Sequence, residues 1–338
     1  MAPMAGYTDS AFRMICKKFG ADVTISELIS ADAIAHGKFS VVISKLSTNV
    51  TGRKNNSTAD LLNFYEVERP FVVQLFGKNP ENFAKASKWI TENLKPDGID
   101  INMGCPARKV VGSDHGAALL KNPALAVKIV KAVKDNTDLP VSVKTRLGWN
   151  NDGEILEFAP MLMSAGIDAI IIHGRTYKDG FKGEARWENI YKVKKLLGNK
   201  VVVIGNGDIV NSSQLSVLSS QEYRNTITGT ASCQLDGFAI GRAAFGKPWI
   251  FSENTDNRIQ ITALKEIILE HARLAEKTKA EKGIVEFRKH LLSYLKGFPD
   301  AKKLRMEAVK IQNTAEIESI LDKLDCQFVA SPIDNIVK

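Results

Sequence analysis

The 338-residue sequence has no apolar run approaching the roughly 18 residues that a membrane-spanning helix requires. Its N-terminus also lacks the basic and then apolar pattern of a secretory signal peptide. These absences argue against membrane and exported proteins, so we expect a cytoplasmic protein that makes no contact with a membrane. A hydrophobic content of 44% is ordinary for a globular chain, and the length suits one large domain and a smaller one.

Cysteine is scarce and scattered. Cys16, Cys105, Cys233 and Cys326 form no C-x-x-C pair, which indicates neither a dense disulfide framework nor a zinc motif. Carboxylates and histidines do not cluster along the sequence, so no metal site is expected. A G-x-G-x-x-G fingerprint after the first predicted strand is missing too, and this argues against a dinucleotide-binding, doubly wound sheet.

Basic residues are in excess, with a net charge of +8 and a pI near 9.1, which favours a polyanionic partner. Residues 282–310 carry eight Lys and Arg against three acidic residues, with Phe287, Tyr294 and Phe298 between them. Basic side chains interleaved with aromatic ones suit a phosphate backbone with unstacked bases. A solvated helix face with aromatic side chains in the core gives the same pattern, and both interpretations stay open.

Short apolar runs alternate with helical stretches through the first three quarters of the chain. Two of the helices begin with an Asn-Pro pair, Asn79-Pro80 and Asn122-Pro123, in which Asn caps the helix and Pro takes its first position. Apolar strands that alternate with helices form a parallel sheet buried on both faces. The runs are residues 23–25, 71–73, 99–101, 141–143, 169–172, 201–204 and 237–240. With residues 1–3 as the stub of a first strand they number eight, which predicts a (β/α)8 TIM barrel.

The pattern becomes helical after Trp249. Apolar positions then recur on one face at 3.6-residue spacing. They are Leu264, Ile267, Ile268, His271 and Ala275. We therefore expect a barrel over residues 1–250 and a smaller all-helical domain over residues 251–338. Residues 37–63, with 41–43 as their only core candidate, and residues 217–234 are polar and are expected to be surface insertions.

Polar side chains follow six consecutive predicted strands at their carboxyl ends. They are Gln74, Asn102 with Cys105, Lys144 with Arg146, His173, Asn206 with Asp208, and Arg242. In a barrel these ends meet at one face, where active sites lie. Taken singly, His173 fits a core histidine and Lys144 fits a strand-end lysine that reaches solvent. Their joint occurrence favours a functional site.

Cys105 lies in the stretch Asp-Ile-Asn-Met-Gly-Cys-Pro at residues 100–106, directly after a predicted strand. Most cysteines are small packing residues, but loops at strand ends carry chemistry, so we predict that this thiol is reactive. The glycines of residues 205–208 and of Gly241-Arg242 expose backbone N–H groups where barrels commonly hold a phosphate. A helix starting after Gly241 would add its positive end.

Nine motifs occur in order along nearly the whole chain. They are residues 2–9, 73–77, 100–106, 143–148, 172–176, 205–209 and 240–243, and, in the helical region, residues 287–290 and 296–299. Each is weak alone, but in this order they are specific, and the chain resembles the bacterial-type tRNA-dihydrouridine synthase family.

The resemblance implies FMN at the mouth of the barrel and a role for each motif residue. Pro3, Met4 and Ala5 would line the flavin, and Gln74, Lys144 and His173 would contact the edge of its ring. Asn206, Gly207, Asp208, Gly241 and Arg242 would take the ribityl chain and phosphate. Asn102, Arg175, Arg288 and Lys289 would bind the substrate, with Asn102 orienting the uracil.

The implied reaction is reduction of the C5–C6 double bond of specific uridines in tRNA to dihydrouridine. FMN would deliver a hydride to C6 and Cys105 a proton to C5, after NADPH or NADH had transiently reduced the flavin. A thiol, with an ordinary pKa of about 8.5, is mostly protonated at neutral pH and can act as an acid. A stacked uracil must be extruded to reach the pocket. The expected partner is tRNA, bound by a monomer through the helical domain.

Two alternatives remain. One is an FMN barrel that acts on a free pyrimidine such as dihydroorotate, but such an enzyme needs no basic helical domain. The other is a tRNA-binding module without turnover, against which the presence of Cys105, Lys144 and His173 argues.

Overall fold

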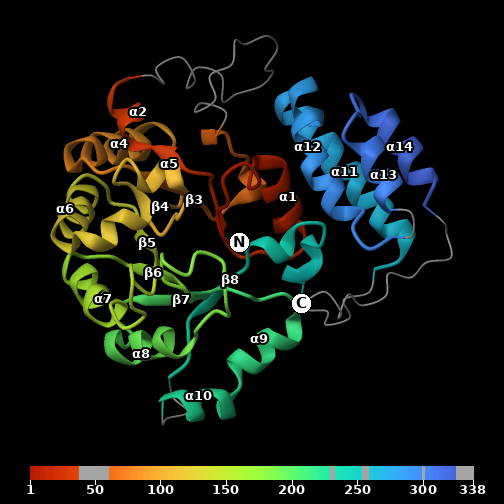
Figure 1. Cartoon of the computed structure of the whole chain (residues 1–338). Helices are drawn as coiled ribbons and strands as arrows, with labels where there is room; N and C mark the ends of the chain where they lie inside the picture. Colours follow the sequence, from red (N-terminus) through yellow and green to blue (C-terminus); the bar gives the residue numbers. More distant parts are fainter. Residues whose placement is uncertain (38–60, 229–232, 253–258, 299–300, 325–338) are drawn as a thin grey trace.

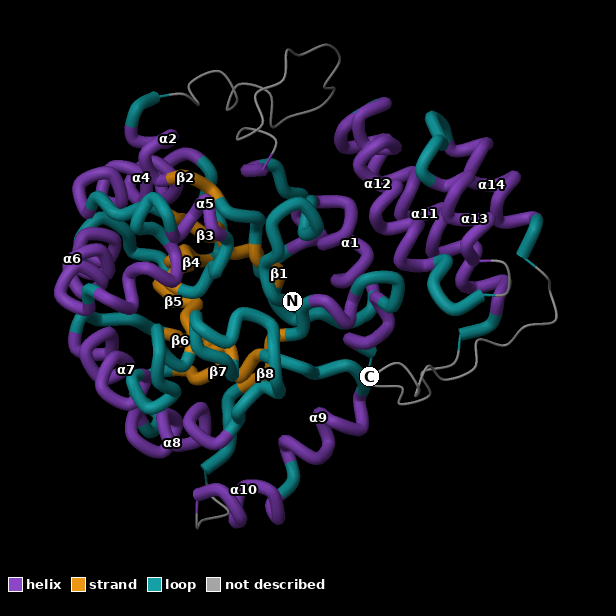
Figure 2. The backbone as a smooth tube through the Cα atoms, viewed as in Figure 1, coloured by secondary structure: helices purple, strands orange, loops and turns teal. Residues whose placement is uncertain are grey.

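The computed structural model describes residues 1–37, 61–228, 233–252, 259–298 and 301–324. A parallel sheet curls into a barrel in the larger part of the molecule (Figures 1 and 2). Its strands are β1 (Thr24–Ile25), β2 (Ile29–Ser30), β3 (Phe71–Phe76), β4 (Gly98–Met103), β5 (Val141–Arg146), β6 (Ala169–His173), β7 (Val202–Asn206) and β8 (Gly237–Ala239). The strands from β3 to β8 follow one another in sequence order, β1 and β2 both pair with β3, and all pairs are parallel. The predicted barrel and its seven apolar runs are confirmed; β2 was not predicted.

Residues 1–2 bridge the two edges of the sheet. The amino group of Met1 donates to the Val23 carbonyl at 2.7 Å, beside β1. The Ala2 N–H donates to the Ile240 carbonyl at 2.8 Å, beside β8. The predicted stub of a first strand therefore lies where an eighth strand would close the barrel, although it is too short to form a strand itself.

Helices cover the outside of the barrel, as Figure 1 shows. They are α1 (Ser10–Lys18), α2 (Ala31–Ala35), α4 (Pro80–Asn93), α5 (Arg108–Val111), α6 (Pro123–Lys134), α7 (Ile155–Ser164) and α8 (Glu188–Leu197). Both predicted Asn caps are confirmed, since Asn79 and Asn122 accept N–H bonds from the first turns of α4 and α6. Strand side chains such as Val143, Ile170 and Val203 are fully buried, and each stabilises the fold by roughly 1.5–3 kcal/mol.

The C-terminal part of the chain is a helical bundle beside α1 (Figure 1). It consists of α11 (Ile261–Lys279), α12 (Glu281–Tyr294), α13 (Ala301–Ala308) and α14 (Thr314–Asp322). The residues predicted to share one face of α11 are all buried, as expected. Ala11 and Ile15 of α1 belong to the same apolar core, so the bundle is packed onto the barrel. The division at residue 250 stays a prediction.

The aromatic residues among the basic ones of residues 282–310 belong to the bundle core. Phe287 and Tyr294 are 1% and 3% exposed, and Phe298 packs against the same core. Phe287 and Tyr294 are therefore core residues on which bases cannot stack, and the binding of phosphates by the basic side chains of this stretch stays a prediction.

Other segments differ from expectation or lie outside the description. Part of the predicted insertion at 217–234 forms helices, α9 (Ser212–Ser219) and α10 (Gln221–Thr228), and Tyr223 of α10 packs edge-on against Tyr191 of α8. Residues 38–60, including the core candidate at 41–43, are outside the described residues. No helix within the described ranges is long and apolar enough to cross a membrane.

Candidate active site

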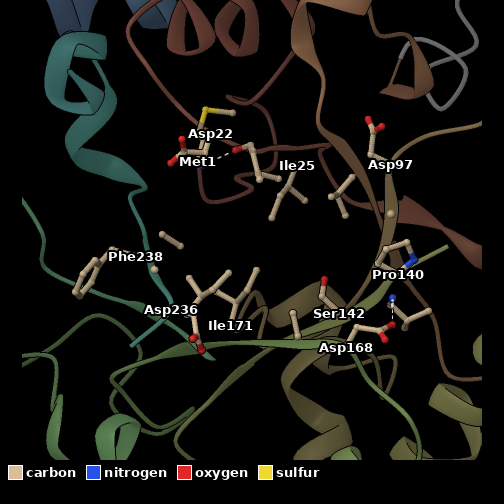
Figure 3. A pocket seen from close by; sticks show the side chains of 18 of the residues that line it. Met1, Asp22, Ile25, Asp97, Pro140, Ser142, Asp168, Ile171, Asp236 and Phe238 are labelled. Carbon is tan, nitrogen blue, oxygen red and sulfur yellow. Dashed lines mark hydrogen bonds between the residues drawn. The ribbon is translucent and has the colours of Figure 1, made fainter. Parts of the chain in front are cut away.

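The barrel has a cavity at each end, and the one at the amino ends of the strands is structural. It has a volume of about 330 Å³ and is lined mainly by apolar side chains, including Ile25 and Ile171, with acidic side chains at its rim (Figure 3). Asp168 accepts from the Val141 N–H at 2.7 Å and pairs with a lysine of α6. Asp236 accepts from the Val203 N–H at 2.7 Å and pairs with a lysine of α8. These carboxylates fix the starts of the strands.

The cavity at the carboxyl ends, with a volume of about 660 Å³, is lined by every residue that the sequence predicts for cofactor binding. Its size suits a small-molecule site of roughly 300–1,000 Å³. It contains Pro3, Met4, Ala5, Gln74, Lys144, His173, Asn206, Gly207, Asp208, Gly241 and Arg242, together with Asn102 and Cys105. Strand register explains this gathering, because His173 pairs directly with Asn206 and Asn102 with Lys144 across neighbouring strands.

The loop that carries Cys105 is held on both sides. The side-chain oxygen of Asn102 accepts from the Cys105 N–H at 3.0 Å. The Cys105 carbonyl accepts from the Ala117 N–H at 3.1 Å, and the Gly104 carbonyl accepts from Arg146 Nε at 2.8 Å. The backbone of this loop is therefore fixed while the half-buried thiol lines the cavity.

A hydrogen-bonded chain runs from the barrel interior to this loop. Ser142 Oγ donates to the buried Asp100 carboxylate at 2.5 Å, and Gln74 Nε2 donates to it at 2.7 Å. Gln74 Oε1 in turn accepts from Asn102 Nδ2 at 3.0 Å. Burial raises the pKa of Asp100 to about 7, although the hydrogen bonds from Ser142 and Gln74 oppose the rise. The sequence analysis did not assign Asp100 to the site.

Lys144 points into the same cavity. Its Nζ donates to Asn206 Oδ1 at 3.1 Å, and Asn206 Nδ2 donates to the Ala239 carbonyl at 2.6 Å. Burial and the neighbouring Arg146 lower the pKa of Lys144 to about 8. The amine is therefore cationic at neutral pH, in a site where its charge is little shielded by water.

His173 is neutral and has a ring nitrogen without a partner. Burial, with the cations Lys144, Arg146, Arg175 and Arg242, lowers its pKa to about 2. Its Nδ1 is buried and makes no hydrogen bond to any described residue. A buried polar atom at a cavity wall indicates that a ligand hydrogen-bonds to it, because leaving such an atom without a hydrogen bond costs about 1–3 kcal/mol.

Two glycines line the far end of the cavity at positions where a side chain would be crowded by its neighbours. Gly207 has φ +129°, and a Cβ there would lie 2.8 Å from the Ala185 side chain. A Cβ on Gly241 would lie 3.3 Å from Met4 Sδ. The expected helix after Gly241 is not formed: Arg242–Ala244 is a three-residue 3₁₀ segment, which brings no helix dipole.

The basic rim contains residues that the sequence analysis left without a role. Phe181 is 57% exposed on the loop after β6, and the guanidinium groups of Arg242 and Arg146 lie 4.9 and 5.5 Å from its ring centre. Lys296, from the end of α12, also lines the cavity and brings the helical bundle to its edge. In the sequence, Phe181 lies between two glycines in a polar loop. An aromatic residue in such a loop is the signal from which its place at the rim could have been predicted.

Three predicted substrate-binding residues lie elsewhere. Arg175 is 3% exposed and donates to the Asp208 carboxylate at 2.6 Å. It therefore stabilises the loop that carries Asp208 from the protein interior. Arg288 donates from two guanidinium nitrogens to the Ile311 carbonyl within the bundle. Lys289 lies 5.5 Å from the ring centre of Tyr7, close to the loop that lines the cavity. Their roles toward substrate stay predictions.

Comparison with known proteins agrees with this site. The family described as dihydrouridine synthase (Dus) matches residues 1–330. A protein of Aquifex aeolicus (strain VF5) described as a probable tRNA-dihydrouridine synthase is 36% identical over 324 residues, which cover 94% of this chain and 92% of that protein. The tRNA-dihydrouridine synthase B of Pseudomonas aeruginosa is 35% identical over 326 residues, covering 93% and 88%. Since the match runs from the first residues of the cavity to the helical bundle, the chain belongs to the dihydrouridine synthase family and is an enzyme that forms dihydrouridine in tRNA.

Proposed function

We propose that the larger cavity holds FMN and that the chain uses it to reduce the C5–C6 double bond of uridines in tRNA. One observation carries the proposal: the thiol of Cys105 shares a single cavity with every residue predicted to contact the flavin. When bound, FMN supplies the hydride that adds to C6, and NADPH or NADH restores the reduced cofactor.

The residues present fit the flavin. The unpartnered Nδ1 of His173 and the cationic Nζ of Lys144 line the cavity and would contact the polar edge of the flavin ring, where a cation would stabilise the negative charge of a reduced flavin. Arg242, 58% exposed at the rim, and the backbone at Gly207 and Gly241 would take the phosphate. Arg175 neutralises Asp208, whose carboxylate would otherwise repel that phosphate.

Cys105 supplies the proton that completes the reduction of the uracil. Its thiol donates a proton to C5 of the uracil as C6 gains its hydride, and the resulting thiolate regains a proton from solvent. The fixed loop keeps the sulfur at the cavity wall, and Asn102 would present its amide to the uracil edge.

The helical bundle provides a tRNA surface in this proposal. Lys296 lines the cavity, Lys289 lies 5.5 Å from the ring centre of Tyr7, and Lys302, Lys303 and Lys310 are exposed on and after α13. Basic side chains of this kind bind phosphates whatever the base sequence. The target uridine is extruded from the tRNA into the cavity. We assign residues 1–250 to catalysis and residues 251–338 to tRNA binding, by a monomer in the cytoplasm.

The experiment is reconstitution of the purified protein with FMN, NADPH and tRNA that lacks dihydrouridine. We expect flavin absorbance in the protein and dihydrouridine in the tRNA, detected by mass spectrometry. Turnover of dihydroorotate instead of tRNA would favour the free-pyrimidine alternative. Tight tRNA binding without flavin absorbance, even after FMN is added, would favour the binding module and overturn the proposal.

A further inference from the structure

Three side chains with metal-ligating atoms meet where the barrel joins the helical bundle. Asp9 caps α1, His271 lies in the middle of α11, and His290 lies on α12. They are 6%, 0% and 1% exposed, and one ligand atom from each lies within 4.8 Å of the others. The sequence indicated no such site because Asp9 lies more than 260 residues from either histidine along the chain.

The histidines are incompletely satisfied. His271 Nδ1 lies 3.2 Å from the Tyr294 hydroxyl, but His271 Nε2 and both ring nitrogens of His290 have no hydrogen-bond partner among the described residues. The Tyr7 backbone lies near the His290 ring without the geometry of a hydrogen bond. Buried polar groups of native proteins are normally paired, so unpaired nitrogens aimed at a carboxylate indicate a bound group.

We propose that Asp9, His271 and His290 form a binding site for one divalent transition-metal ion, with Zn²⁺ as the best fit. Two imidazole nitrogens and a carboxylate oxygen suit this ion, and a water molecule completes a tetrahedral shell. His271 fits the usual pattern of such ligands, because its Nδ1–H can donate to Tyr294 while Nε2 faces the ion.

The protonation states are those that a metal requires. Burial lowers the pKa of His290 to about 4 and that of His271 well below its ordinary value, so both rings are neutral. Burial alone would raise the pKa of Asp9, but Lys279 and the hydrogen bond from the Phe12 N–H hold it below its usual range, so the carboxylate is ionised.

Lys279 and Lys289 are the cations that act on the site, and the charge of Lys279 is balanced. Its Nζ lies 3.2 Å from Asp9 Oδ2 and 2.6 Å from Glu286 Oε2. Among the described residues, Asp9 Oδ1 accepts the Phe12 N–H alone, and each carboxylate oxygen retains a lone pair for an ion. Aromatic rings enclose the group: the ring centre of Phe12 lies 4.8 Å from that of His290, and the ring centre of Phe287 lies 4.9 Å from that of His271. The site is therefore shielded from water.

The test uses tag-free, full-length protein stripped with a chelator, to which Zn²⁺ alone or Co²⁺ alone is added. We expect one equivalent of bound metal, a Tm rise on the order of 5 °C at saturating Zn²⁺, and a visible Co²⁺ spectrum of tetrahedral type. His271→Ala and His290→Ala should abolish all three, whereas the exposed His36→Ala should keep them.

Packing of the histidine rings without a metal is the competing explanation. His290→Phe keeps an aromatic ring in the core and removes the ligand, and Asp9→Asn keeps an N-cap residue while removing the charge. Loss of the Zn²⁺-dependent Tm rise in both folded variants would support the site. Absence of stoichiometric metal in the wild type, or an unchanged response in both variants, would overturn it.

Discussion

Gln74 donates through Nε2 to the buried Asp100 carboxylate at 2.7 Å, and this bond fixes which way the Gln74 amide faces. With Nε2 turned to Asp100, Oε1 is the end that accepts from Asn102 Nδ2. Asn102 then has its oxygen free for the Cys105 N–H. Asp100 therefore sets the direction of each hydrogen bond in the chain that runs through Gln74 and Asn102 to the Cys105 N–H.

Asp100→Asn should lower kcat because it reverses the donor-to-acceptor direction of the hydrogen bonds in this chain. The new Asn side chain keeps an oxygen that accepts from Ser142, but it then presents its NH₂ group to Gln74. The Gln74 amide must rotate so that its oxygen accepts from this NH₂ group. Its own NH₂ group then faces the NH₂ group of Asn102. Leaving a buried donor unpaired costs about 1–3 kcal/mol, so we expect roughly a 5- to 100-fold drop in single-turnover dihydrouridine formation with flavin content retained. Ser142→Ala removes one bond without reversing any and should lower the rate far less. Equal rates for wild type and Asp100→Asn would remove Asp100 from the catalytic machinery.

The stability of the fold should depend on pH through the same carboxyl group. Asp100 has a pKa of about 7 in the folded chain, against about 3.9 when unfolded. Between these values the folded state binds more protons, so the contribution of Asp100 to the free energy of unfolding falls as pH rises from 4 to 7 and is constant above. Urea unfolding at pH 4.5 and 8 should show wild type losing on the order of 2–4 kcal/mol relative to Asp100→Asn. A difference independent of pH would contradict the raised pKa.

The barrel and most of the residues at the carboxyl ends of its strands could be predicted from the sequence, because both follow from local patterns. Apolar runs mark buried strands, and parallel strands bring their carboxyl ends to one face, so Gln74, Lys144 and His173 were found without any contact being known. Asp100 was missed because it lies inside a strand and not after it. Its position two residues before Asn102 puts both side chains on one side of β4, and that spacing was the available signal.

Two other features had no local signal. The cluster of Asp9, His271 and His290 depends on how the bundle packs against α1, which no short pattern encodes. Lys296 was visible as one charge in a basic stretch and as the first residue of the motif at 296–299, but the packing of α12 decides that it reaches the cavity.

Cys105→Ala should abolish turnover and leave binding unchanged. The loop is fixed through backbone atoms, which Ala retains, so FMN and tRNA affinities should match wild type. Loss of a general acid lowers rates by about 10²- to 10⁴-fold, to be measured in a single turnover with pre-reduced enzyme. Cys233→Ala, at a buried cysteine beside the Tyr191 carbonyl, is the matched control and should keep full activity. Undiminished dihydrouridine formation by Cys105→Ala would exclude the thiol as the proton donor.

Arg242→Ala should weaken flavin retention. Its guanidinium is 58% exposed at the rim and 3.7 Å from Asp208, where the phosphate of FMN would lie. Loss of a charge-assisted bond of about 1.5–3 kcal/mol predicts a Kd for FMN roughly 10- to 100-fold higher, measured by flavin fluorescence. Arg273→Ala on α11, an arginine 64% exposed and paired with Glu318, should leave the Kd unchanged. If both variants bind FMN like wild type, Arg242 does not contact the phosphate.

The basic residues of α12 should differ in what they contribute to tRNA binding. Lys296 lines the cavity and Lys289 lies beside Tyr7, whereas both guanidinium nitrogens that Arg288 uses donate to the Ile311 carbonyl. Changing both lysines to Ala should flatten the plot of log K against log salt by about 1–2, since each phosphate contact contributes about 0.7–0.9 to its slope. Arg288→Ala should lower Tm with a smaller change in slope, because it removes bonds inside the bundle.

The matched control for the two lysines is Lys85→Ala with Lys88→Ala on α4, an outer helix of the barrel. This pair removes the same charge from a surface away from the cavity, so the salt dependence of tRNA binding should stay that of wild type. Equal slopes for the two double variants would mean that net charge alone governs tRNA binding. The α12 surface would then be an ordinary solvated helix face, and the path of the tRNA would have to be sought elsewhere on the rim.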